Sequence, residues 1–377
     1  MKNGEWTTEE FDFNQKNIPD DLRIFARSAS DSKGPAMSLI SALKILKEQQ
    51  ITPEYNIKVV MDFQEELGSP DLPKAVLNNK SLLQAEMLLI MDGTRHLSNL
   101  PTLTYGARGI TTATITIFGS TDALHSGQYG NFAPNPVFKA AQLISSFKDE
   151  KGIVQINGFY EGVHLSDRDK ELLNSIPENM DSLNLRLGIA TSEKVADTYQ
   201  EALQFPSFNI RGLKAGWTGK EVRTLIPEEV IIEIDMRLVP ETPGERQMEL
   251  LRAHIKEEGF YIVDSIPTKE ERAAYPKLVS LDYRIGSKPF RTEMDSSIGE
   301  FLNSALTKVF GNTIVNMRTT GGSQPMAPFI EALNIPAVSI RIPNPDNNIH
   351  APNENLRMGN YKEGIISCIA VLTEKLP

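Results

Sequence analysis

The chain is poor in cysteine and in basic charge, and it has no long apolar run. Cys368 is the only cysteine, so no intrachain disulfide can form and thiolate metal ligands are nearly excluded. No apolar run approaches the roughly 20 residues that a bilayer-spanning helix needs. With a net charge of −10, the chain is a poor partner for nucleic acids or anionic membranes. Any metal site must therefore be built from His, Asp and Glu.

The composition is that of a folded chain. Its 377 residues suggest roughly two or three domains at about 150 residues each. A hydrophobic fraction of 40% allows a sizeable core. The first residues, MKNGEWTTEEFDFNQ, are acidic and lack the pattern of a signal peptide. We therefore expect a cytoplasmic protein.

Short, nearly continuous apolar runs alternate with helical segments early in the chain and near its end. The runs are Leu22–Ala26, Ile57–Phe63, Met87–Met91 and Ala337–Ile342. A segment with helical spacing, Pro35–Gln50, follows the first run. Such runs are typical of strands buried on both faces. The pattern predicts an α/β domain with a mostly parallel sheet flanked by helices.

The middle of the chain has a different pattern, beginning with the alternating, β-branched segment TTATITIFG at 111–119. We expect next a helix at Pro136–Phe147, strands at Phe208–Leu213 and Val230–Leu238, a helix at Gly244–Glu258 and a strand within Tyr261–Arg284. This β-α-β-β-α-β order is that of a ferredoxin-like α+β domain. We place it as an insertion at 109–288, which divides the first domain into 1–108 and 289–377. That domain is expected to resume with a helix at Met294–Val309.

Acidic and histidine residues follow four of the predicted strands. They are Asp31, the pair Glu65 and Glu66, Asp92 and His350. The carboxyl ends of the strands in an open parallel sheet line the ligand crevice, so we expect these residues to converge there. Carboxylate oxygen and imidazole nitrogen suit Zn²⁺ or Mn²⁺, and bound metal would neutralise the clustered carboxylates.

The pair Glu65–Glu66 suggests hydrolysis. One carboxylate can bind metal, while its neighbour takes a proton from a metal-bound water and passes it to a leaving amine. Simpler interpretations stay open for each residue. Asp31 can cap a helix, Asp92 can form a turn, His350 can be a loop histidine, and the glutamate pair can be a solvated turn. Jointly, the positions favour a metal hydrolase.

Seven stretches along nearly the whole chain match, in order, the motifs of one family. They are SASDSKG at 28–34, EELGSPDL at 65–72, MDGTRHLSNLPTLTYGARG at 91–109, LHSGQYG at 124–130, TLIPEEVIIEIDMRLVP at 224–240, GGSQP at 321–325 and HAPNE at 350–354. The chain thereby resembles the M20 family of dinuclear zinc peptidases, in particular its cytosolic non-specific dipeptidase and carnosinase branch.

The resemblance implies a role for each residue of the predicted metal site. Asp31 resembles the carboxylate that bridges two metal ions, Zn²⁺ or Mn²⁺, in each subunit. Glu66 and His350 resemble ligands of one metal ion, and Asp92 resembles a ligand of the other. Glu65 resembles the general base. The expected reaction is hydrolysis of peptide or amide bonds in dipeptides or similar small substrates.

The resemblance also implies roles outside the metal site. The inserted domain is similar to the family's lid, which forms a homodimer interface. His125 resembles the histidine that reaches the partner's active site and stabilises the oxyanion, where Thr224 can assist it. Arg237 resembles a clamp for the substrate carboxylate, and Gly322 and Ser323 resemble a loop that lines the pocket. Without the resemblance, His125 could cap a turn and Arg237 could be a solvated edge charge.

The family's first metal ligand is a histidine in a His-x-Asp motif, and this ligand has no counterpart ahead of Asp31. Trp6 resembles the stretch just after that motif, so we expect an N-terminal strand and helix to be absent. The metal at Asp92 would then keep only Asp92 and Asp31, which makes a weak zinc site. His96 is a candidate substitute. The alternative function is therefore a truncated, weakly active or inactive dimer that binds at most one metal.

Two further stretches depart from the family's pattern. Thr320 stands where the dipeptidase branch carries an acidic residue that can pair with a substrate's free amine. This favours a second alternative, an amidohydrolase acting on N-acyl amino acids. The stretch ARSAS at 26–30 replaces a glycine-flanked arginine of the relatives, with no effect that we can assign.

Overall fold

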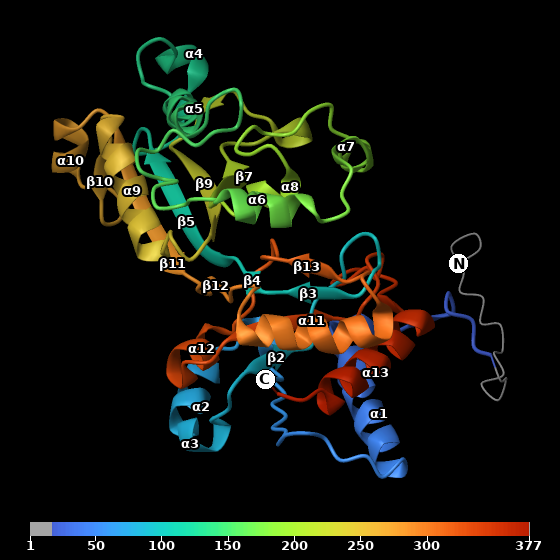
Figure 1. Ribbon diagram of the computed structural model, residues 1–377. Helices are drawn as coiled ribbons and strands as arrows, with labels where there is room; N and C mark the ends of the chain where they lie inside the picture. Colours follow the sequence, from blue (N-terminus) through green and yellow to red (C-terminus); the bar gives the residue numbers. More distant parts are fainter. Residues whose placement is uncertain (1–16, 377) are drawn as a thin grey trace.

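The computed structural model describes residues 17–376, which gather around two main β-sheets (Figure 1). We call the two parts of the molecule the four-stranded unit and the five-stranded unit, after their main sheets. No helix in residues 17–376 is long and apolar enough to cross a membrane. The expectations for MKNGEWTTEEFDFNQ and for Trp6 concern residues 1–16, which lie outside the described part of the chain.

The four-stranded unit is built on a mixed sheet with the order β13–β3–β14–β2. The strands are β2 (Leu88–Ile90), β3 (Thr102–Thr104), β13 (Val315–Met317) and β14 (Ala337–Arg341). β13 is parallel to β3 and β14 is parallel to β2, whereas β14 and β3 are antiparallel. The α/β class with mostly parallel pairing is therefore confirmed. A small outlying pair, β1 (Arg23–Phe25) with β15 (Asn355–Arg357), is antiparallel.

Helices cover this sheet and bury its apolar strands. They are α1 (Gly34–Glu48), α2 (Leu72–Asn78), α3 (Lys80–Leu83), α11 (Ser297–Phe310), α12 (Ala327–Leu333) and α13 (Met358–Thr373). Phe301 and Leu302 of α11 pack in one cluster with Leu103 of β3 and Ile340 of β14. α11 begins at the side chain of Ser296, which accepts a hydrogen bond from the backbone N–H of Gly299.

The strand expected at Ile57–Phe63 does not form. These residues pair with no strand, and no backbone hydrogen bond joins residues 56–63 to another residue of the described chain. β-branched residues favour extended structure, but a strand is held only by the hydrogen bonds of a neighbouring strand. Within the described residues the sheet ends at β2, and this segment does not pair with that edge.

The five-stranded unit has the predicted ferredoxin-like order. Its main elements are β5 (Gly109–Phe118), α5 (Pro136–Phe147), β7 (Ser207–Lys214), β9 (Glu229–Leu238), α9 (Gly244–Glu257) and β11 (Leu278–Ile285). In the sheet, β5 lies between β11 and β9, and β9 pairs with β7, all antiparallel. An additional strand, β10 (Tyr261–Val263), lies parallel to β11 at the edge.

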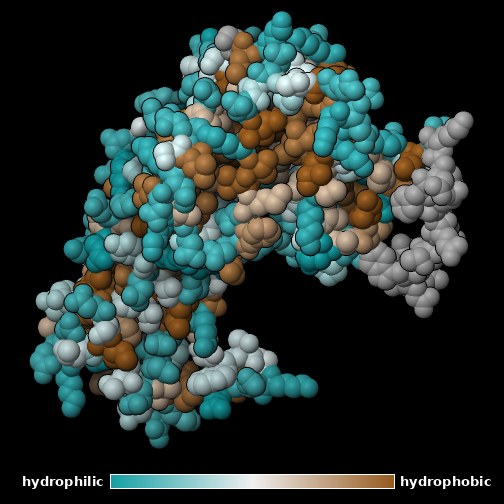
Figure 2. All heavy atoms as spheres, turned by 90° about the horizontal axis from the view of Figure 1, so that it is seen from below, coloured by the Kyte–Doolittle hydropathy of each residue, from teal (hydrophilic) through white to brown (hydrophobic). Residues whose placement is uncertain are grey.

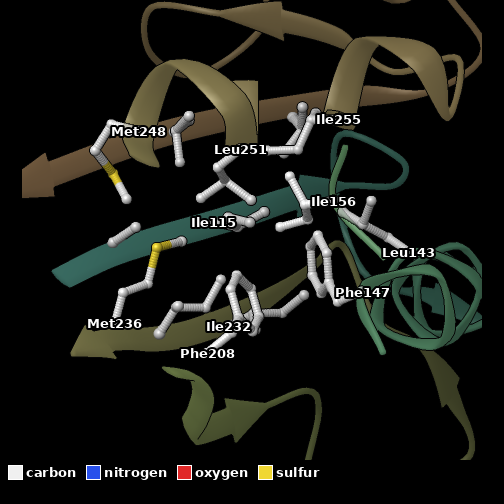
Figure 3. Close-up of a cluster of buried hydrophobic side chains, with 14 of the residues drawn as sticks. Ile115, Leu143, Phe147, Ile156, Phe208, Ile232, Met236, Met248, Leu251 and Ile255 are labelled. Atoms are coloured by element: carbon white, nitrogen blue, oxygen red, sulfur yellow. The ribbon is translucent and has the colours of Figure 1, made fainter. Parts of the chain in front are cut away.

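The core of this unit lies between its sheet and the helices α5 and α9 (Figure 3). Residues of β5 and β9 alternate between buried and partly exposed, as the sequence pattern predicts. Ile115 and Ile232, both fully buried, meet Phe147 of α5 and Leu251 of α9 in this core. Phe208 of β7 stacks at a tilt on Phe147, with ring centroids 4.8 Å apart.

Shorter elements fill the connections. They are η1 (Ala29–Lys33), η2 (Glu65–Leu67), β4 (Gly106–Ala107), β6 (Leu124–His125), α4 (Ser126–Tyr129), α6 (Asp167–Asn174), α7 (Met180–Leu187), α8 (Tyr199–Ala202), η3 (Gly219–Glu221), β8 (Leu225–Ile226), α10 (Lys269–Ala274) and β12 (Phe290–Arg291). α6 to α8 occupy a polar region to which the sequence assigned no structure. The strands β4 and β12 pair where the chain passes between the two units.

Candidate metal centre

Three donor atoms from distant parts of the sequence meet in the four-stranded unit. Asp31 lies on η1, Glu66 lies on η2, and His350 lies in the loop after β14. The Nε2 atom of His350 is 2.9 Å from Asp31 Oδ2 and 3.0 Å from Glu66 Oε2. The three donors all lie within 4.8 Å of one another. One imidazole and two carboxylates at this separation fit the ligands of a Zn²⁺ or Mn²⁺ ion.

The predicted convergence is therefore found, but strand ends explain only part of it. Asp92 follows β2 and His350 follows β14, as expected. Asp31 instead follows the outlying strand β1, and Glu66 follows a segment that forms no strand. The positions of these two residues depend on loop contacts that the strand pattern does not contain.

Glu354 fixes the loop that carries Asp31. Its buried carboxylate accepts hydrogen bonds from the backbone N–H groups of Ser28, Ser30 and Asp31, at 2.9 to 3.0 Å. Burial alone would raise the pKa of Glu354, but these backbone donors and Arg27 outweigh it and hold the pKa below its usual value. The residue ends the HAPNE motif, yet the sequence assigned it no role.

Asp92 stands beside this group and is held by protein donors. Its Oδ1 atom accepts hydrogen bonds from Ser32 Oγ and from the N–H of Gly93, both at 2.7 Å. Its Oδ2 atom lies 3.3 Å from Gln324 Nε2. The hydroxyl of Ser32 also lies 3.2 Å from Asp31 Oδ1, so it spans the two aspartates. Asp92 is thus close to the metal group without being one of its three donors.

A buried guanidinium lies next to Asp92. Arg341 donates to the carbonyl of Asp92 at 2.5 Å and to Thr104 Oγ1 at 3.2 Å. Burial lowers the pKa of Arg341 to about 10, and the charge of Asp92 opposes this shift. The arginine places positive charge beside an otherwise acidic cluster. Nothing in the residue pattern of β14 identified it.

The carboxylates raise each other's proton affinity. Burial, followed by the charges of Asp92 and Glu66, raises the pKa of Asp31. Burial raises the pKa of Glu65 to about 7, with further contributions from Asp92 and Asp31. Partial burial alone would lower the pKa of His350, but the carboxylates of Glu66 and Asp31 outweigh it. Clustered negative charge of this kind is what a bound cation would relieve.

Two of the residues predicted to bind substrate meet between the two units. Arg237 of β9 donates to Ser323 Oγ at 3.3 Å, which joins the five-stranded unit to the loop after β13. Arg108 lies near enough that its charge and that of Arg237 repel. A side chain at Gly322 would meet open space, so this part of the loop faces a free volume.

His125 and Thr224 lie elsewhere. His125 is exposed, and its Nδ1 atom accepts a hydrogen bond from the N–H of Gly127 at 3.1 Å, where it caps α4. The carbonyl of Thr224 accepts from the N–H of Ser126. In Figure 1, α4 lies at the end of the five-stranded unit away from the four-stranded unit. Within one chain, the fold brings neither residue to the metal group.

His96 is not among the donors of the metal group. Its ring is buried, with Nδ1 3.0 Å from Ser98 Oγ and Nε2 3.3 Å from Glu178 Oε1. Glu178 also accepts from Gln200 Nε2 at 2.7 Å. His96 therefore belongs to a polar contact between the two units, since Glu178 lies just before α7.

Comparison with known proteins gives the class. The family model for peptidase family M20/M25/M40 matches residues 2–374. The Cys-Gly metallodipeptidase dug1 of Schizosaccharomyces pombe is 26% identical over 96% of this chain and 74% of its own length. The human Beta-Ala-His dipeptidase is 26% identical over 91% of this chain and 67% of its own length.

A solved structure agrees with these sequence matches. The M20 family metallo-carboxypeptidase Sso-CP2 from Sulfolobus solfataricus superposes with a TM-score of 0.78 and is 28% identical, covering 94% of this chain and 78% of that one. The chain belongs to peptidase family M20/M25/M40. The predicted family and enzyme class, a metallopeptidase, are thereby confirmed.

Proposed function

We propose that this chain hydrolyses peptide or amide bonds in dipeptides or similar small substrates, with Zn²⁺ or Mn²⁺ bound at Asp31, Glu66 and His350. The observation that carries the proposal is the meeting of these three donors beside Glu65. The names of the relatives, a Cys-Gly metallodipeptidase and a Beta-Ala-His dipeptidase, support the substrate class.

Different residues of the chain have different roles in the proposed hydrolysis. A bound divalent ion supplies charge that acidifies water and polarises the scissile carbonyl. Glu65 accepts a proton from the attacking water and delivers it to the leaving amine, and its partial burial favours the protonated form that the second transfer needs. Arg237, held beside Ser323, clamps the substrate carboxylate. Gly322 leaves room for the substrate.

We also propose roles for the two domains and for His125. Residues 109–288 act as a lid and dimerisation domain, and residues 1–108 with 289–377 form the catalytic domain. His125 is exposed at the far end of the lid, which suits a residue that acts in the partner's active site, with Thr224 beside it. We place the protein in the cytoplasm, on the composition of the chain alone.

A panel of dipeptides, incubated with purified wild type and Glu65→Gln in the presence of Zn²⁺ or Mn²⁺, tests the mechanism. We expect Glu65→Gln to keep the metal and to lose about 10²- to 10⁴-fold in kcat, the usual contribution of a general base. Glu48→Gln, at an exposed position on α1, is the matched control and should behave as wild type. Equal turnover by Glu65→Gln and wild type would remove Glu65 from the mechanism.

One observation favours fewer than two metal ions. Ser32, Gly93 and Gln324 already satisfy the carboxylate of Asp92. A chain that binds one ion at Asp31, Glu66 and His350 and turns over slowly is therefore the second candidate. Metal equivalents per chain, measured by mass spectrometry of the native protein, distinguish one ion from two.

Thr320 favours an amidohydrolase of N-acyl amino acids as a third candidate. Its backbone is fixed by a bridge to Ala107, and its neutral side chain cannot form an ion pair with a substrate amine. The same dipeptides with free and acetylated amines decide between the two substrate classes. A preference for the acetylated forms supports the amidohydrolase.

A further inference from the structure

The loop between β13 and α12 contacts both units of the molecule. We call residues 318–324 (Arg-Thr-Thr-Gly-Gly-Ser-Gln) the linking loop. At its start, the buried guanidinium of Arg318 lies 3.3 Å from Asp169 Oδ1 and donates to Gln204 Oε1 at 3.0 Å. Asp169 is on α6 and Gln204 follows α8, so both partners belong to the five-stranded unit. The linking loop is therefore held to that unit where it begins.

The linking loop contacts the five-stranded unit a second time near its end, where Ser323 Oγ accepts a hydrogen bond from Arg237 at 3.3 Å. Between these two contacts, the N–H of Thr320 donates to the carbonyl of Gly106 on β4, at 3.0 Å. The contacts lie where the two units face each other (Figure 1), away from the underside on which Figure 2 shows apolar side chains. A displacement of the five-stranded unit would therefore move the linking loop at two points.

The last residue of the linking loop, Gln324, contacts the metal centre. Its side chain is 5% exposed, its Nε2 atom donates to Asp92 Oδ2 at 3.3 Å, and its Oε1 atom lies 3.5 Å from Ser339 Oγ. The hydroxyl of Ser32 lies 2.7 Å from Asp92 Oδ1 and 3.2 Å from Asp31 Oδ1. Adjacent residues of the linking loop thus contact an arginine of the five-stranded unit and the aspartate beside the metal donors.

We propose that Gln324 is a positioning residue that couples the contact between Arg237 and Ser323 to the metal group. Its amide is held at both ends, so a shift of the linking loop moves the carboxylate of Asp92. The hydroxyl between the two aspartates carries this shift to Asp31, one of the three donors. A substrate carboxylate bound at Arg237 would thereby adjust the metal group, and a bound metal ion would in turn favour that carboxylate. The inference rests on the metal binding proposed above.

A double-mutant cycle in Zn²⁺ affinity, measured by calorimetric titration of the metal-free protein, tests the coupling. Gln324→Leu keeps roughly the size of the side chain and removes its amide, and should weaken Zn²⁺ binding about 2- to 30-fold. Ser323→Ala removes the contact with Arg237 and should weaken binding by a smaller factor. In the double variant, Ser323→Ala should have no further effect, because its effect passes through the amide that leucine lacks.

Gln247→Leu is the matched control, since it removes a buried glutamine amide at a distance from the linking loop. Gln247 of α9 is fully buried and donates to the carbonyl of Phe159 within the five-stranded unit. This variant should bind Zn²⁺ as wild type does. Additive losses in the double variant, unchanged affinity in Gln324→Leu, or equal losses in Gln324→Leu and Gln247→Leu would each overturn this inference alone. Wild type that binds no Zn²⁺ would overturn the proposed function together with it.

Discussion

At the scale of single residues, the geometry of the candidate metal site depends on side chains other than its three donors. Glu354 holds the N–H groups of Ser30 and Asp31, and Ser32 spans Asp31 and Asp92. Such outer contacts fix the direction in which a ligand points. The proton affinity of the cluster is likewise a collective property, because burial and then the neighbouring carboxylates raise the pKa values of Asp31 and Glu65.

Glu354→Gln is expected to weaken metal binding by about 10- to 100-fold, the usual cost of losing an outer contact. The amide keeps the shape of the side chain but replaces one acceptor oxygen with a donor, which opposes the N–H groups of the loop. Isothermal titration of Zn²⁺ into the metal-free protein measures the change. Glu201→Gln, at another buried glutamate that caps a helix turn, should leave the affinity unchanged. Equal losses in both variants would indicate general destabilisation instead.

The sequence predicted the metal ligands better than the residues that hold those ligands in place by hydrogen bonds. Asp31, Glu66 and His350 could be found because acidic and histidine residues near strand ends are suggestive one by one. Glu354 and Gln324 lie in quoted motifs, HAPNE and GGSQP, but their partners are distant in sequence. Every residue except proline has a backbone N–H, so the sequence of a loop does not indicate which of its N–H groups donates to a distant side chain.

At the scale of elements, the turn after β2 is fixed by a glycine. Gly93 adopts a φ of +86°, and a Cβ there would lie 1.5 Å from Arg341 Nη1. The turn therefore requires glycine at position 93 for two reasons, its backbone conformation and the close approach of the buried guanidinium. This approach places Asp92 beside Asp31.

Gly93→Ala should destabilise the fold by about 2–4 kcal/mol, the sum of left-handed strain and a steric clash. Gly68→Ala is the matched control, since Gly68 has a φ of +78° and open space around it. We expect the control to cost only the strain, about 1–2 kcal/mol. Urea unfolding of both variants measures the difference. Equal losses would show that the Arg341 contact is unimportant.

The elements themselves were largely predictable. The ferredoxin-like unit follows from alternation and turn positions, which are local properties of β5, α5 and α9. The segment 57–63 has an equally clear strand pattern, yet it forms no strand in the described part of the chain. Pairing depends on the arrangement of the other strands, which the local pattern does not contain. One strand was expected within Tyr261–Arg284, whereas two form there, β10 and β11, because three residues of edge strand carry too little pattern to be told apart.

At the scale of the whole molecule, polar contacts join the two units. Arg291 of β12 donates to Glu241 at 2.5 Å, and Arg318 lies 3.3 Å from Asp169. Burial alone would raise the pKa of Glu241, but the hydrogen bond and charge of Arg291 outweigh it and lower the pKa. Both partners are mostly buried, so solvent screens the pair only in part.

The Arg291–Glu241 pair should make the free energy of unfolding depend on pH. Because the folded pKa of Glu241 lies below its unfolded value, the stabilisation is complete above the unfolded pKa and is lost as the pH falls through the folded pKa. Glu241→Gln should cost about 1–3 kcal/mol at pH 7 and less at about pH 4. Urea unfolding at both pH values checks this. A loss that is the same at both values would contradict the assignment.

The central claim is that Asp31, Glu66 and His350 bind a catalytic metal ion. Calorimetric titration of Zn²⁺ into metal-free wild type, His350→Ala and His164→Ala tests it most directly. His164 is exposed in the five-stranded unit and serves as the control. The account predicts that wild type and His164→Ala bind equally well, and that His350→Ala loses more than the roughly 100-fold expected for an outer contact. Unchanged affinity in His350→Ala would contradict it.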